Sequence, residues 1–134
     1  MVQHDFDVTA FGNPKGYMDN GIKPDKPTFY YSDKNLINKF AKNNYIKLGT
    51  IATGDIFVTD TKLKNIINHE FDADAIDMES AAIAQTAQRN NIPANILRTI
   101  SDGYNGTTDE YKQNKQDIAK IPALFIIKTL KSES

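Results

Sequence analysis

In this 134-residue chain, the stretch Asp77-Met78-Glu79-Ser80-Ala81-Ala82 is the most informative about the fold, because it joins a strand pattern directly to a helix pattern. Residues 73–78 form a short apolar run, and the small residues from Ser80 onward favour a helix lasting to about Asn90. Two carboxylates stand where the strand would end, and a carboxylate there is costly unless it is paired, hydrogen-bonded or used. Open α/β sheets place their ligand crevice at this end of their strands. The stretch therefore predicts an α/β fold with a ligand site.

Two other stretches repeat this arrangement on either side of the first. Thr53-Gly54-Asp55-Ile56-Phe57-Val58 begins where the apolar run 45–53 ends, and Arg98-Thr99-Ile100-Ser101-Asp102 closes the run 94–100. Each places polar or aromatic side chains just after an expected strand. Because parallel strands present their carboxyl ends at one edge of a sheet, the three stretches predict one shared crevice.

Apolar periodicity and turn signals predict alternating strands and helices along the chain. Expected strands cover residues 4–11, 45–53, 73–78 and 94–100. Expected helices begin at Ser32, at Asp60 or Thr61, at Ser80, and at Thr107 or Thr108, the last one kinked or restarted near Lys120 by Pro122. This order predicts a three-layer α/β/α sheet without internal repeats.

Composition limits the classes of function. Sixteen Lys and Arg against 17 Asp and Glu give a net charge of −1, so no basic excess favours nucleic acid or a membrane surface. The absence of cysteine excludes disulfides, thiolate metal sites and a cysteine nucleophile, and it is typical of a cytoplasmic protein. His4 and His69 lack metal-ligand spacing. We therefore expect no metal, no cofactor, and no membrane or nucleic-acid partner.

The three stretches, in this order and spacing, resemble the nucleoside-binding half of the 5′-methylthioadenosine/S-adenosylhomocysteine nucleosidases. Asp5-Phe6-Asp7-Val8-Thr9-Ala10-Phe11-Gly12 also matches that family's pattern. The resemblance implies a nucleoside phosphorylase-like fold that is incomplete at its amino end, with residues 1–134 as the carboxyl-terminal part of one domain. It also implies hydrolysis of the N-glycosidic bond of 5′-methylthioadenosine and S-adenosylhomocysteine, with release of adenine, in methionine salvage.

By this resemblance Asp102 is the catalytic acid that protonates N7 of the departing adenine, with Ser101 beside it in the site. A carboxyl group in a poorly solvated cleft can stay protonated near neutral pH, because desolvation penalises its charged form. Without the other motifs, an aspartate before Gly103 is more simply a residue that caps a turn.

The resemblance also implies contacts to ribose and adenine. Glu79 binds the ribose hydroxyls and Met78 packs on the sugar, whereas Asp77 stands where relatives usually carry a longer glutamate, so its ribose contact stays open. Phe57 stacks on the adenine, and the backbone at Val58 hydrogen-bonds the base edge. Taken alone, Glu79 is ordinary chemistry for the first turn of a helix and Phe57 is an ordinary core residue.

The remaining implications concern the partner and the missing part of the site. Phe11 resembles the residue that reaches across a homodimer to line the partner's pocket for the 5′-substituent, although Asn13 replaces an aromatic residue there. The family's water-activating glutamate has no counterpart in this chain, so we expect the chain alone to be inactive and prone to aggregate. Two alternatives stay open: a purine nucleoside phosphorylase, for which only Arg89 and Arg98 could hold phosphate, and a non-catalytic fragment that binds nucleoside.

Overall fold

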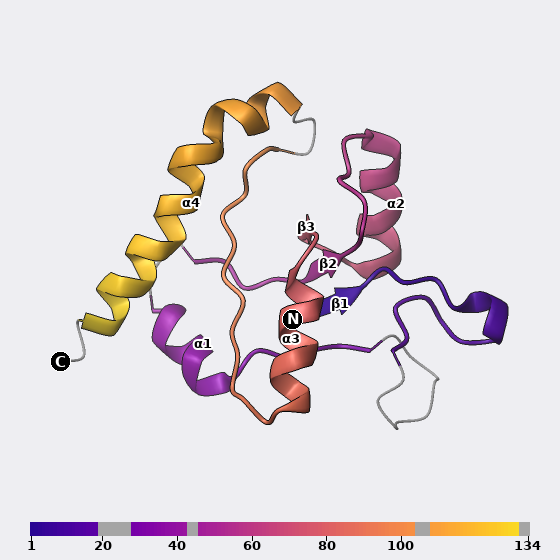
Figure 1. Cartoon of the computed structure of the whole chain (residues 1–134), viewed down its shortest axis with the longest axis horizontal. Helices are drawn as coiled ribbons and strands as arrows, with labels where there is room; N and C mark the ends of the chain where they lie inside the picture. The colour runs from indigo at the N-terminus through magenta and orange to yellow at the C-terminus, as the bar shows by residue number, and fades with distance from the viewer. Residues whose placement is uncertain (19–27, 43–45, 104–107, 132–134) are drawn as a thin grey trace.

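A small parallel sheet forms the centre of the computed structural model, with its strands in the order β1-β2-β3 (Figure 1). The structure describes residues 1–18, 28–42, 46–103 and 108–131. The three strands are β1 (Val2–His4), β2 (Ile51–Thr53) and β3 (Ala75–Asp77). The helices are the 3-10 turn η1 (Thr9–Phe11), α1 (Lys34–Phe40), α2 (Thr61–Phe71), α3 (Ser80–Arg89) and α4 (Thr108–Lys131).

Helices α2 and α3 cover opposite faces of this sheet, because successive residues of a strand point to opposite sides. Ala52 of β2 packs with Ile67 and Phe71 of α2 in one buried cluster. The next residue, Thr53, faces α3 instead, and its Oγ1 accepts the backbone N–H of Ala81 at 3.0 Å. The predicted three-layer α/β/α arrangement is therefore confirmed.

Helix α2 illustrates how the sequence forms these elements. The Asp60 side chain caps it by accepting the backbone N–H groups of Lys62 and Leu63, as one of the two predicted caps. Ile67 and Phe71, four residues apart, then lie on the face that packs against the sheet.

Residues 94–100 do not form the predicted strand. A strand forms only where its backbone pairs with a neighbouring strand, and no backbone hydrogen bond joins the described residues 94–100 to β1, β2 or β3. The outer edge of β1 is bonded to Tyr30, which exchanges two backbone hydrogen bonds with Val2 at 2.9 and 2.8 Å. The segment instead runs as an irregular trace between α3 and α4 (Figure 1).

The other predicted strands and helix ends differ in extent. Of the strand expected at 4–11, only His4 is in a strand, as the last residue of β1, because the Asp7 side chain accepts the backbone N–H of Thr9 and turns the chain into η1. The strand expected at 45–53 is only β2. Asp33, not Ser32, caps α1 by accepting two backbone N–H groups. Helix α4 runs through Pro122 without restarting, and the predicted cap at Thr107 lies outside the described residues.

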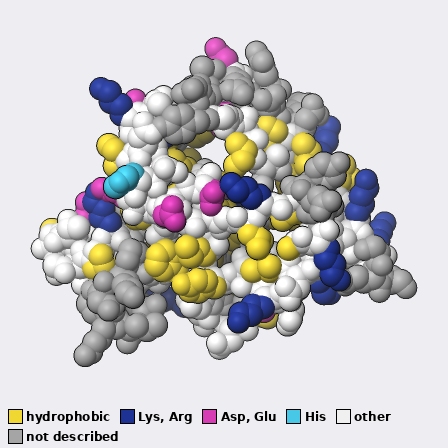
Figure 2. Space-filling view, turned by 180° about the vertical axis from the view of Figure 1, so that it is seen from behind, with side chains coloured by type: hydrophobic (Ala, Val, Ile, Leu, Met, Phe, Trp, Pro, Cys, Tyr) yellow, Lys and Arg dark blue, Asp and Glu magenta, His cyan; other side chains and the backbone are white. Residues whose placement is uncertain are grey.

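The molecule exposes many large hydrophobic side chains for its size, and Figure 2 shows several of them beside acidic and basic groups on one face. The exposed ones include Ile56, Phe57, Met78, Ile83 and Ile100. Within the described residues, no helix combines the length and hydrophobicity needed to cross a membrane.

Candidate functional site

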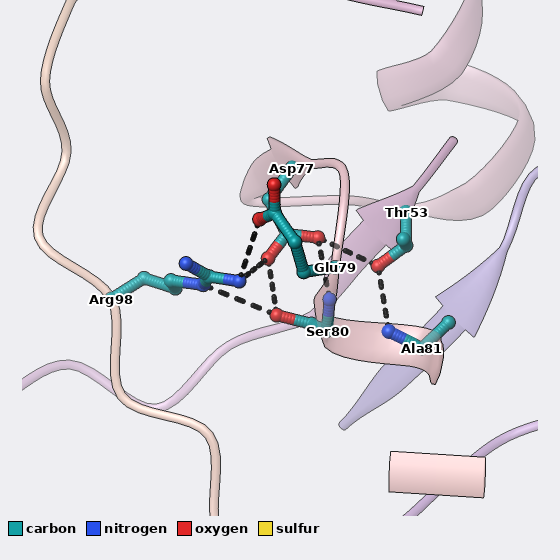
Figure 3. Close-up of polar contacts among 6 residues, drawn as sticks. All are labelled: Thr53, Asp77, Glu79, Ser80, Ala81 and Arg98. Carbon is teal, nitrogen blue, oxygen red and sulfur yellow. Dashed lines mark hydrogen bonds and ion pairs between the residues drawn. The ribbon is translucent and has the colours of Figure 1, made fainter. Parts of the chain in front are cut away.

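Asp77, the last residue of β3, is the centre of a polar cluster between β2 and the start of α3 (Figure 3). Its Oδ1 accepts the Thr53 hydroxyl at 2.7 Å and the Ser80 backbone N–H at 3.3 Å. Its Oδ2 accepts the Ser80 hydroxyl. The parallel register places Thr53 beside Asp77, so the sheet itself brings the first of these partners together. Asp77 is thus a carboxylate held by three donors and mostly shielded from water, with a side chain 11% exposed.

Arg98 reaches from the irregular segment after α3 and links this cluster to Glu79 (Figure 3). One guanidinium nitrogen, Nη2, lies 2.7 Å from Asp77 Oδ2 and 3.0 Å from Glu79 Oε2. The adjacent Nε donates to the Ser80 hydroxyl at 3.2 Å. A planar guanidinium can satisfy two carboxylates at once, which the point charge of lysine does less well. Arg98 therefore neutralises two neighbouring acidic groups that would otherwise repel each other.

The Glu79 carboxylate differs from that of Asp77 in its access to solvent. Its side chain is 61% exposed, while its Oε2 is held in place by Arg98. An oriented carboxylate that still faces water can accept hydrogen bonds from an incoming hydroxylated ligand. Asp77 is less accessible, and its Oδ2 contacts the same Arg98 nitrogen that holds Glu79.

Asp102 is held separately, by Lys64 of α2. The Lys64 ammonium donates to Asp102 Oδ2 at 3.2 Å, and the Ser101 hydroxyl donates to Asp102 Oδ1 at 2.7 Å. Lys64 is one of the buried residues of α2, and the Asp102 side chain is 24% exposed. Both oxygens of Asp102 thus have a defined partner, although the segment that carries it forms no strand.

The aromatic and apolar residues predicted for the site are exposed. Phe57 and Met78 are large exposed hydrophobics near the ends of β2 and β3, and the half-buried Val58 packs against the cluster of Ile67 and Phe71. Phe11, in η1, is 83% exposed. The structure therefore joins Asp77 with Glu79, and Ser101 with Asp102, into two separate clusters.

Another carboxylate, that of Asp5, follows β1 at the same end of the sheet. Its backbone N–H donates to the Thr53 carbonyl at 2.8 Å, and its side chain lies so close to Gly54 that a Cβ there would be 2.1 Å from Oδ2. Burial raises the pKa of Asp5 above its usual 3.8, and the nearby Asp55 adds to this rise. His4 Nδ1 lies 3.4 Å from Asp5 Oδ1 and accepts the backbone N–H of Phe6 at 3.0 Å, and the nearby His4 partly offsets the rise in the pKa of Asp5.

A hollow elsewhere on the molecule contains none of the predicted site residues. It is lined by residues of β1, of the segment before α1, of α3 and of the segment after α3, among them Val2, Tyr30, Ala84 and Ile96. These side chains are mainly apolar and lie on the α3 face of the sheet. Asp33 is the one carboxylate among its lining residues, and that side chain caps α1 by accepting the backbone N–H groups of Asn35 and Leu36.

Sequence reasoning missed the role of Lys64 and of Thr53. A signal for Lys64 exists, because it stands three and seven residues before the buried Ile67 and Phe71 and so shares their face of α2. A lysine in an apolar stripe is a candidate for an internal ion pair. Thr53 carries no such signal, since threonine is common in strands.

Comparison with known proteins places these residues in a family. The family model described as Phosphorylase superfamily matches residues 1–131. The chain is 37% identical over 134 residues to an aminodeoxyfutalosine nucleosidase of Campylobacter jejuni, a match covering 96% of this chain and 56% of the relative. It is 36% identical over 115 residues to a 5′-methylthioadenosine/S-adenosylhomocysteine nucleosidase of Staphylococcus haemolyticus, covering 81% and 48%. The chain thus spans about half the length of the curated relatives it matches.

Solved structures agree with the sequence matches. A 5′-methylthioadenosine/S-adenosylhomocysteine nucleosidase of Campylobacter jejuni superimposes with a TM-score of 0.80 at 35% identity, over 98% of this chain and 58% of that one. The Helicobacter pylori nucleosidase bound to a pyrrolopyrimidine inhibitor gives a TM-score of 0.83 at 30% identity, over 98% and 57%. The predicted nucleoside phosphorylase-like fold and the resemblance to these nucleosidases are confirmed. The chain belongs to the phosphorylase superfamily.

Proposed function

We propose that this chain supplies the nucleoside-binding and leaving-group residues of an N-glycosidase that hydrolyses adenine nucleosides carrying a 5′-substituent. The observation that carries the proposal is the Asp77–Arg98–Glu79 cluster at the carboxyl end of the sheet, which presents an exposed, oriented carboxylate. A carboxylate that accepts hydrogen bonds from two neighbouring ribose hydroxyls gives a charge-assisted anchor for the sugar. Glu79 also lies where its charge would favour an oxocarbenium-like ribosyl cation.

Asp102 acts in this proposal as the acid for the leaving base. The N-glycosidic bond breaks with its electron pair going to adenine, and the Asp102 carboxyl proton moves to N7. The Ser101 hydroxyl, 2.7 Å from Oδ1, fixes the carboxyl group. The half-exposed Phe57 stacks on the base and the Val58 backbone bonds its edge.

The nucleoside is the first point to test, because the relatives' names differ in it. The Campylobacter relative is named for aminodeoxyfutalosine, and the Staphylococcus relative for 5′-methylthioadenosine and S-adenosylhomocysteine. We propose the 5′-thio nucleosides as substrates, with aminodeoxyfutalosine as the second candidate because of that relative's 37% identity. Adenine release from each nucleoside is measured for the chain alone and for the chain co-expressed with the amino-terminal part of the Campylobacter relative that it does not match.

The assay in phosphate-free buffer separates hydrolysis from phosphorolysis. Hydrolysis predicts adenine release that is unchanged when phosphate is added, whereas a phosphorylase requires phosphate. Release from the chain alone would show that a residue within 1–134 activates water. No release in either form, together with no binding of 5′-methylthioadenosine, would overturn the proposed function.

A substitution of Glu79 tests the proposed ribose contact, with 2′-deoxy nucleosides as the matched control. Glu79→Gln should weaken nucleosides that bear a ribose 2′-hydroxyl by about tenfold or more, and their 2′-deoxy analogues much less, because the lost hydrogen bond is charge-assisted. Equal losses for both would assign Glu79 to the start of α3 rather than to the sugar.

The proposal extends to assembly and location. Phe11 is 83% exposed on a turn, as expected of a residue that lines a partner's site in a homodimer. We also propose a cytoplasmic location, for which a chain without cysteine is typical.

A further inference from the structure

Lys64 is a charged group that the proposed reaction leaves without a role. It is buried in α2, on the face that carries Ile67 and Phe71, and burying an ammonium there is costly unless it is paired. Its ammonium reaches Asp102 Oδ2 at 3.2 Å and the Gly103 carbonyl at 3.5 Å. A side chain of α2 therefore contacts the proposed acid, Asp102, directly.

The position of the Lys64–Asp102 ion pair in the fold indicates its role. A catalytic acid at the end of a paired strand is positioned by the hydrogen bonds of the sheet. Residues 94–100 form no strand, so Asp102 lacks that support. Asp102 is held by the hydroxyl of its neighbour Ser101 and by Lys64, a buried residue of α2.

We infer that Lys64 is a positioning residue for the reaction proposed above: it fixes the Asp102 carboxyl group against α2, so that the acid is held in one place beside the leaving base. The inference rests on the proposed function. The second contact, to the Gly103 carbonyl, restrains the backbone beyond the acid.

The test compares two leaving groups. Lys64→Met should lower kcat for adenine release from 5′-methylthioadenosine by about 10- to 100-fold, the range expected when a reacting group is misplaced by about 1 Å. It should change the rate less than about threefold for the 5′-methylthioribosyl glycoside of 4-nitrophenol, because 4-nitrophenolate departs without a proton from an acid. Lys64→Arg should restore most of the activity on 5′-methylthioadenosine. Lys62→Met, an exposed position on the same helix, should match the wild type on both substrates.

The outcomes separate the two proposals. If both substrates lose rate equally in Lys64→Met, Lys64 is only structural and the inference is overturned. These rates are measured on the chain co-expressed with the amino-terminal part of the Campylobacter relative. If that wild-type form releases no adenine and binds no 5′-methylthioadenosine, the proposed function fails, and Lys64 is then tested by unfolding alone. A double-mutant cycle of Lys64→Met and Asp102→Asn should show a coupling of about fivefold in the unfolding equilibrium constant. No coupling would overturn the inference whatever the activity.

Discussion

Strands β1, β2 and β3 are fixed by backbone pairing and by apolar packing against α2, whereas residues 94–103 are fixed largely through polar side chains. The links from this segment run from Arg98 to Asp77 and Glu79, and from Asp102 to Lys64. In addition, the Ala94 carbonyl accepts the Asp33 backbone N–H at 2.9 Å. We therefore expect the sheet and α2 to contribute most of the free energy of unfolding. Residues 94–103 place charged groups where a ligand can contact them.

The largest expected effect comes from Asp102→Asn, which removes the chemistry of the polar segment. In the form that releases adenine, the rate should fall about 10²- to 10⁴-fold, because the amide keeps the hydrogen-bond geometry but cannot deliver a proton. Nucleoside affinity should change little, whereas the free energy of unfolding should fall by about 1 kcal/mol, because the buried Lys64 loses its charged partner. Activity close to that of the wild type would remove Asp102 from the mechanism.

Phe71→Ala should have the opposite signature, because Phe71 belongs to the sheet region. Its ring is buried with Ala52 and Ile67, and truncation leaves a cavity that costs about 3–4 kcal/mol in urea unfolding. Ile66→Ala, on the exposed face of the same helix, should cost less than about 1 kcal/mol. Equal losses at the two positions would contradict the assignment of the core to this face of α2.

Arg98→Met should lie between these two effects. It leaves Asp77 with the Thr53 and Ser80 donors, so the free energy of unfolding should fall by about 1–2 kcal/mol. Nucleoside binding should weaken as well, since Glu79 loses the cation that orients it. Arg89→Met, at the exposed end of α3, is the matched control and should be nearly neutral. Residues 94–103 should also become more susceptible to protease in Arg98→Met and at high salt, which screens partly exposed charge pairs.

The comparison also explains what the sequence could and could not predict. The boundary between β3 and α3 follows from local rules, because apolar residues end at Asp77 and small residues begin at Ser80. The fate of residues 94–100 depends instead on backbone pairing with a neighbouring strand, and nothing in the run itself reports that no such pairing forms. The apolar pattern of a strand predicts which of its faces is buried, but it does not predict which strand it pairs with.

The same limit applies to the site. Carboxylates at strand ends are visible in the sequence because they are costly there, so Asp77, Glu79 and Asp102 could be singled out in advance. Their cations could not be assigned, because Arg98 and Lys64 lie 21 residues after Asp77 and 38 residues before Asp102. Only the packing of α2 and the path of residues 94–103 bring these charges together.

The smallest expected effect concerns Asp5, whose carboxylate lies at the sheet edge against Gly54. Burial, with Asp55 nearby, raises its pKa in the folded chain, so the unfolded chain loses this proton first as the pH rises from about 4. The contribution of Asp5 to stability is therefore complete below the unfolded pKa and is lost as the pH rises through the folded pKa. Asp5→Asn should accordingly gain stability relative to the wild type between about pH 4 and neutrality, by less than about 1 kcal/mol because water still screens the charge. Urea unfolding at pH 4 and at pH 7 measures this gain. A difference that stays constant with pH would show that the charge of Asp5 costs the sheet edge nothing.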